Sequence, residues 1–179
     1  MNAPAPMILK PEVSAFFQEA THTVTYIVHE EGGFSCAIID PVLDYDPRSG
    51  WTATDAADEV IAHVKGNDLQ VEWILETHAH ADHLTAAPYL KQHLGGRIAI
   101  GEHIVAVQAT FKKIFNLGED FVADGSQFDR LLSDGAGIRL GALEGRVMHT
   151  PGHTPACVSY VFGDCVFVGD TIFMPDYGT

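Results

Sequence analysis

Cysteine is scarce in this sequence, and its scarcity excludes one class of protein. Cys36, Cys157 and Cys165 are the only cysteines among 179 residues. Small secreted domains that depend on disulfides carry many cysteines in even numbers, so the chain does not fit that class. A reducing compartment suits three unpaired thiols, and we therefore expect a cytoplasmic protein.

Basic residues and long apolar runs are also scarce. Lys and Arg total 10 against 24 Asp and Glu, which gives a formal net charge of −14. Nucleic acids and anionic membranes require a basic face, so neither is an expected partner. No run approaches the roughly 20 apolar residues of a membrane span. Residues 1–17 lack the basic start and the long apolar stretch of an export signal.

The composition nevertheless supplies enough material for a packed core. Hydrophobic residues make up 46% of the chain and charged residues 19%, and the length predicts a single domain over residues 1–179. Helices and strands alternate in the first part, whereas short strands and glycine turns follow residue 121. This order predicts a layered α/β (α+β) domain with sheets inside and helices outside.

The spacing of apolar residues sets the expected elements. Helical spacing predicts helices over 54–65, 85–94 and 102–116. Alternating or continuous apolar runs predict strands over 21–28, 34–40, 70–75, 97–101, 127–132, 137–140, 146–149, 156–162 and 165–168. Residues 44–50 (DYDPRSG) contain turn-forming dipeptides and are expected to form a loop.

A dense group of ligand-type side chains follows the strand expected at 70–75. His78, His80, Asp82 and His83 lie within six residues, separated only by alanines. Sites in α/β folds commonly lie at the carboxyl ends of strands, and alanine leaves room for the side chains to converge on an ion. The spacing therefore indicates a metal site rather than four unrelated surface residues.

Two further ligand-type residues occupy similar positions later in the chain. His153 lies in a turn between two expected strands, and Asp170 follows the strand expected at 165–168. Imidazole and carboxylate ligands without thiolates suit Zn, Fe or Mn. Asp40 also ends a strand, where it can either orient a ligand or simply cap a turn.

Three segments together resemble the metal motifs of the metallo-β-lactamase superfamily, in the order in which that family has them. They are residues 77–83 (THAHADH), 150–154 (TPGHT) and 169–170 (GD). The amino-acid sequences around the first two segments are most similar to those of the persulfide dioxygenase branch. The resemblance implies an αββα sandwich with its metal centre at the edge of the sheets. It also implies that Asp40 orients a metal ligand or the loop that carries it.

The resemblance implies two alternative metal arrangements. In the dioxygenase branch, one Fe(II) is held by residues matching His78, His153 and Asp170. Its open positions accept a persulfide, such as glutathione persulfide, and O2. In the dimetal hydrolase branch, which cleaves thioesters or lactones, one ion is held by residues matching His78, His80 and His153. Asp82 and His83 help to hold a second ion there, and Asp170 bridges the two. One or two Zn(II) ions are therefore the alternative cofactor. A non-catalytic metal-binding domain is a third alternative.

Family members extend beyond the position that matches Thr179, and dimetal members take a late histidine ligand from that extension. The chain is therefore expected to be the N-terminal portion of the sandwich, apparently incomplete at its C-terminal end. The chain contains all three residues that match the ligands of the single iron, but it lacks the late histidine of the dimetal ligand set. The resemblance also leaves a homodimer open. Cys157 is expected to be a small core residue rather than a sulfur carrier.

Overall fold

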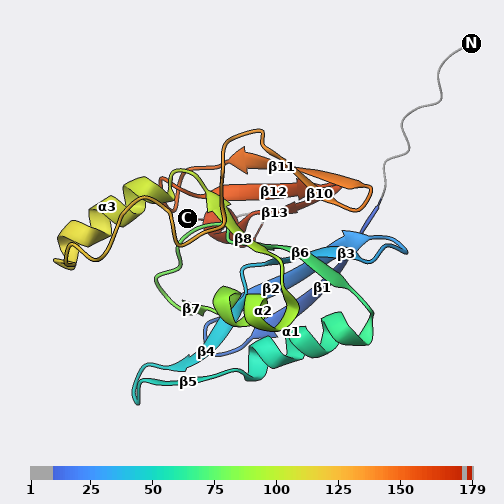
Figure 1. The fold of residues 1–179 in the computed structure, drawn as a ribbon, viewed down its shortest axis with the longest axis horizontal. Helices are drawn as coiled ribbons and strands as arrows, with labels where there is room; N and C mark the ends of the chain where they lie inside the picture. The colour runs from blue at the N-terminus through green and yellow to red at the C-terminus, as the bar shows by residue number, and fades with distance from the viewer. Residues whose placement is uncertain (1–9, 175–176, 179) are drawn as a thin grey trace, which may run out of the picture.

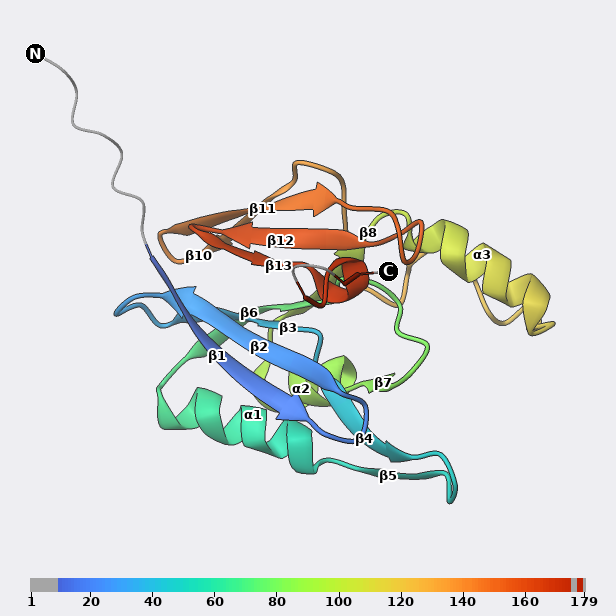
Figure 2. The same cartoon turned by 180° about the vertical axis from the view of Figure 1, so that it is seen from behind.

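The computed structural model describes residues 10–174 and 177–178. Residues 1–9, 175–176 and 179 lie outside the described residues, and the expectation about an export signal falls largely on residues 1–9. Two sheets lie face to face, and helices cover the outer face of the first sheet (Figures 1 and 2). The predicted layered α/β architecture is confirmed.

The first sheet mixes antiparallel and parallel strands. The first three strands in space form an antiparallel meander, and the remaining pairs are parallel. Parallel strands place their carboxyl ends at one edge, where their loops can meet. In spatial order the strands are β1 (Pro11–Gln18), β2 (Thr23–Glu30), β3 (Ser35–Ile39), β6 (Gln70–Leu75), β8 (Arg97–Gly101) and β9 (Arg130–Leu132).

The second sheet is a purely antiparallel meander. Its strands are β10 (Gly137–Leu140), β11 (Leu143–His149), β12 (Val158–Phe162) and β13 (Cys165–Phe167), followed by the short 3-10 helix η1 (Gly169–Thr171). A three-stranded sheet contains β5 (Trp51–Ala53), β4 (Val42–Asp46) and β7 (Leu84–Thr85). The prediction of a loop over 44–50 is therefore partly wrong, because residues 44–46 belong to β4 and pair with β5.

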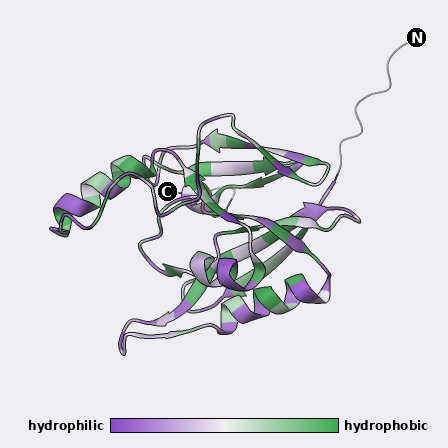
Figure 3. Ribbon diagram, viewed as in Figure 1, coloured by the Kyte–Doolittle hydropathy of each residue, from purple (hydrophilic) through white to green (hydrophobic). Residues whose placement is uncertain are grey.

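The helices follow the predicted spacing of apolar residues. In α1 (Asp55–Gly66), Ala57, Val60, Ile61 and Val64 are buried, and hydrophobic and hydrophilic residues share the helix in Figure 3. Helix α2 (Ala87–Leu94) lies beside α1, while α3 (Ile104–Ile114) lies at the side of the molecule (Figure 1). No helix of the described residues is long and apolar enough to cross a membrane.

Strand β3 is buried on both faces and divides the core in two. Ala37 and Ile39 pack in the cluster between the two sheets, whereas Cys36 and Ile38 pack against the helices. Successive side chains of a strand point to opposite faces, so a strand between two layers must be apolar throughout. This explains why the run 36–39 shows no polar alternation.

Tyr160 joins the two sheets by a buried hydrogen bond. It is fully buried on β12, and its hydroxyl donates to the backbone oxygen of Glu76, at 2.7 Å, just after β6. Tyr160→Phe is expected to lower the free energy of unfolding by about 1–3 kcal/mol, because a buried acceptor loses its donor. Urea denaturation measures the change, and an unaltered midpoint would show that the hydrogen bond contributes nothing.

Candidate metal centre

The candidate centre begins where the neighbouring strands β3 and β6 end. Asp40 follows β3 with a left-handed backbone (φ 49°), and its amide donates to the Leu75 oxygen at 2.9 Å. Its buried carboxylate accepts hydrogen bonds from the Thr77 amide at 2.7 Å and the Thr77 hydroxyl at 2.8 Å. Asp40 thereby fixes the first residue of the histidine-rich loop.

Thr77 passes this constraint on to His78. The hydroxyl oxygen of Thr77 lies 2.9 Å from Nδ1 of His78. Because the hydroxyl hydrogen goes to Asp40, the hydroxyl oxygen accepts from Nδ1–H of His78. The other ring nitrogen, Nε2, then carries the lone pair, which is the arrangement that metal-binding histidines commonly show.

His78, His153 and Asp170 form a cluster that fits a metal ion. Their potential ligand atoms lie within 4.8 Å of one another. Oδ2 of Asp170 is 3.7 Å from Nε2 of His78 and 3.5 Å from Nε2 of His153. Nε2 of His78 is buried without a hydrogen-bond partner, which is costly unless something else occupies its lone pair. Two imidazoles and one carboxylate suit iron or zinc.

The pKa of His78 supports the same arrangement. Burial, followed by the charge of His80, lowers this pKa from 6.5 to about 4. The imidazole is therefore neutral near pH 7, which is the form that binds metals.

Gly169 lets Asp170 approach the first motif. It has a left-handed backbone (φ +50°), and a Cβ built on it would lie 2.3 Å from the hydroxyl oxygen of Thr77. Glycine is the residue that avoids both the strain and the collision. The dipeptide at 169–170 is thus explained by contact between η1 and the histidine-rich loop.

His80 faces away from this cluster, toward two buried carboxylates. Its Nε2 lies 3.3 Å from Oδ1 of Asp40 and 3.3 Å from Oε2 of Glu76. Burial alone would lower the pKa of His80, but the hydrogen bonds and charges of Asp40 and Glu76 outweigh it and raise the pKa to about 10. Glu76 also accepts a hydrogen bond from the hydroxyl of Thr85.

His80, Asp82 and His83 form a second cluster of potential ligands. Nδ1 of His83 lies 3.2 Å from the Leu84 oxygen, while its Nε2 is buried without a hydrogen-bond partner. The second cluster therefore offers one available imidazole, from His83, and one carboxylate, from Asp82.

The structure brings all the predicted ligand residues to one end of the two sheets. Asp40 lies among them, bonded to Thr77 and His80 rather than to the three-residue cluster. Glu76 was not predicted as a site residue, although a charged residue directly after a buried strand was a usable signal. A groove of about 890 Å³ opens beside this end, with Asp40, His80, Asp82 and Asp170 in its wall.

Loss of the Thr77 hydroxyl is expected to weaken metal binding. In Thr77→Val, Nδ1 of His78 loses its acceptor and Asp40 loses a donor, so the ring is no longer held. Partners of this kind are worth about 10–100-fold in metal affinity, and we expect a loss in that range. Titration with Co(II) measures it. Thr110→Val, on the exposed face of α3, is the control, and equal affinity in both variants would contradict the assigned hydrogen bond.

Known proteins share this chain's sequence and architecture. A model of the metallo-beta-lactamase superfamily matches residues 19–179. A protein of Burkholderia pseudomallei (strain 1710b) named "Probable metallo-hydrolase" is 56% identical over 177 residues, covering 93% of this chain and 60% of that protein. The mitochondrial persulfide dioxygenase ETHE1 of Homo sapiens is 27% identical over 176 residues, covering 97% of this chain and 56% of that protein.

A solved structure agrees with these sequence matches. The crystal structure of ETHE1 from Myxococcus xanthus superposes with a TM-score of 0.68 at 26% identity, covering 91% of this chain and 59% of that one. The chain thus spans about 56–60% of the length of these proteins. The resemblance predicted from the three motifs is confirmed.

Proposed function

The chain belongs to the metallo-beta-lactamase superfamily, and on that premise we propose that it is an iron-dependent persulfide dioxygenase. The observation that carries the proposal is the cluster of two imidazoles and one carboxylate, with the buried Nε2 of His78 lacking any hydrogen-bond partner. This donor set is the facial triad of non-haem iron oxygenases. The match to persulfide dioxygenases supports the choice of substrate.

In this proposal His78, His153 and Asp170 hold one Fe(II). The ion, when bound, supplies the redox chemistry by which O2 oxidises the terminal sulfur of a persulfide. The overall reaction balances as RSSH + O2 + H2O giving RSH, sulfite and two protons. Glutathione persulfide, or a related low-molecular-weight persulfide, is the proposed substrate.

The protein residues orient and shield the reacting groups. Asp40 and Thr77 hold His78 in the tautomer that binds metal. Asp170 lies in the wall of the groove, so a substrate that enters the groove would come close to this carboxylate. Phe17 and Tyr26 contribute apolar surface to the same groove, against which the carbon chain of a substrate could pack.

The test combines metal analysis with oxygen consumption. Protein purified from iron-supplemented cells is expected to contain one iron per chain and to consume one O2 per glutathione persulfide, with sulfite as product. The His78→Ala variant is the negative control. Stoichiometric zinc without O2 uptake would overturn the proposal.

A zinc-dependent hydrolase of thioesters or lactones is the second candidate. Two observations favour it: the unpartnered buried Nε2 of His83 in the second cluster, and the 56% identity to a protein named as a metallo-hydrolase. It predicts two ions per chain and turnover without O2. Binding of an ion without turnover of either substrate class would instead indicate the non-catalytic alternative.

The proposal also covers location and assembly. The three cysteines are free, with Cys36 and Cys157 buried, which suits a cytoplasmic protein. A small-molecule persulfide and O2 are the proposed partners, and a homodimer, which the family resemblance leaves open, is the proposed assembly.

A further inference from the structure

The loop that carries His153 requires support beyond packing. It spans residues 150–157, between β11 and β12, and the His153 side chain is 32% exposed. Its ring meets His78 edge-on, with centroids 5.0 Å apart. A half-exposed side chain on a loop reaches a fixed position only if the loop backbone itself is held.

The sulfur of Cys157 lies where it can hold that backbone. Cys157 is 2% exposed, and its Sγ accepts a hydrogen bond from the Thr154 amide at 3.2 Å. That amide belongs to the planar peptide unit that begins at the carbonyl of His153. The sulfur therefore fixes the peptide plane to which the Cα of His153 is attached.

The Thr154 hydroxyl adds a second link to the same sulfur. Its oxygen lies 3.1 Å from Sγ of Cys157 and accepts a hydrogen bond from the Ala156 amide at 3.2 Å. Outside the loop, Nε2 of His149 lies 3.0 Å from the Pro155 oxygen. The loop is thus held by contacts of Thr154 with the Cys157 sulfur inside it and by the contact of Pro155 with His149 outside it.

Cys157 also connects the two segments that carry histidine ligands. The next residue, Val158, donates its amide to the backbone oxygen of Thr77 at 2.9 Å. Thr77 directly precedes His78, so one short path of backbone and hydrogen bonds runs from the His78 segment through Cys157 to His153. Displacing the sulfur would move His153 relative to His78.

We propose that Cys157 is a positioning residue for His153, acting through two hydrogen bonds between its sulfur and Thr154. The inference rests on the proposed metal centre, and it assigns Cys157 no contact with the substrate. It explains why a cysteine in this loop is buried yet has polar partners, whereas buried Cys36 packs only in the apolar cluster against the helices.

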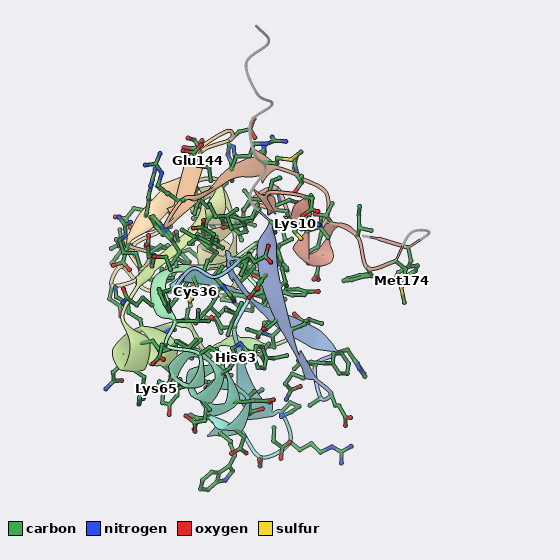
Figure 4. The ribbon with its side chains drawn as sticks, turned by 90° about the vertical axis from the view of Figure 1, so that its right-hand side faces the viewer. Lys10, Cys36, His63, Lys65, Glu144 and Met174 are labelled. Carbon is green, nitrogen blue, oxygen red and sulfur yellow. The ribbon has the colours of Figure 1, made fainter. Side chains whose placement is uncertain are left out.

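The experiment compares Co(II) binding in cysteine variants of the full chain. Cys157→Ala removes the acceptor and is expected to weaken Co(II) binding about 10-fold or more, with a changed visible absorption spectrum. Cys157→Ser restores a hydrogen-bonding atom and is expected to recover most of the affinity. Cys36→Ala is the matched control. It removes another buried thiol, in the interior beside α1 (Figure 4), and should leave Co(II) binding unchanged.

The outcomes separate this inference from the proposed function. Wild-type affinity and spectrum in Cys157→Ala, together with lost binding in His153→Ala, would overturn the inference alone. A wild-type protein that binds Co(II) independently of His153 would overturn both. If Cys157→Ala fails to fold, Thr154→Val tests the hydroxyl contact with the same sulfur, while the Thr154 amide keeps its own. That variant is expected to bind Co(II) more weakly, and unchanged binding would overturn the inference.

Discussion

Replacement of Asp170 by alanine is expected to abolish both the bound iron and persulfide-dependent O2 uptake. Asp170 supplies the only carboxylate of the three-residue cluster, with Oδ2 3.5 Å from Nε2 of His153 and 3.7 Å from Nε2 of His78. Without it, two neutral imidazoles remain to hold a divalent cation. The affinity should fall by more than the roughly 100-fold that loss of a hydrogen-bonded outer partner costs.

Metal analysis and an oxygen electrode measure the two effects on the same preparation. Asp164→Ala is the matched control, because Asp164 is an exposed acid in the turn between β12 and β13. It should keep iron and activity at the wild-type level. Wild-type iron content in Asp170→Ala would exclude Asp170 from the centre.

Replacement of Asp40 by alanine is expected to cause the largest loss of stability. The change leaves the amide and hydroxyl of Thr77 without their acceptor and removes one of the two carboxylates facing His80. Breaking a buried, hydrogen-bonded charge pair costs about 3–5 kcal/mol. Chemical denaturation of the metal-free protein measures the loss, and Asp44→Ala, in the partly exposed strand β4, is the comparison.

The same replacement should change the pH dependence of stability. The pKa of His80 is raised to about 10 in the folded protein against about 6.5 when unfolded. The stabilisation is therefore fully present below pH 6.5 and is lost as the pH rises through 10. The slope is at most about 1.4 kcal/mol per pH unit.

Asp40→Ala removes one cause of the raised pKa, so its stability should fall less steeply between pH 7 and 10. Denaturation curves across this range give both slopes. Parallel slopes for the wild type and the variant would show that Asp40 does not control the charge of His80.

The sequence predicted which candidate ligand residues would lie together better than it predicted the residues that hold them in place. His78, His153 and Asp170 each follow or lie between recognisable strands, and the strand ends bring them together. Strand β6 and strand β8 have the predicted bounds because each is a short apolar run with clear breakers.

Features that depend on distant partners were not predictable from local pattern. Strand β1 was missed because its apolar residues pair with β2 and lack regular alternation. The role of Glu76 depends on His80 and on Thr85 from the next strand, and that of Gly169 depends on Thr77. The polar contacts of Cys157 likewise require the folded loop.

Exposed apolar residues after η1 are a further feature that the sequence pattern did not predict. Phe173 and Met174 are 50% and 64% exposed, and Figure 4 shows Met174 projecting from the body of the molecule. Both residues line the groove beside Asp170. The sequence did not predict that these apolar side chains would form a wall of the groove.

In the proposed centre, His78, His153 and Asp170 hold one ion. The most direct test is a crystal structure of the iron-loaded protein with anomalous diffraction data collected at the iron absorption edge. We expect a single iron peak within about 2.0–2.3 Å of Nε2 of both histidines and Oδ2 of Asp170. A peak coordinated by Asp82 and His83 instead, or no peak at the three-residue cluster, would contradict it.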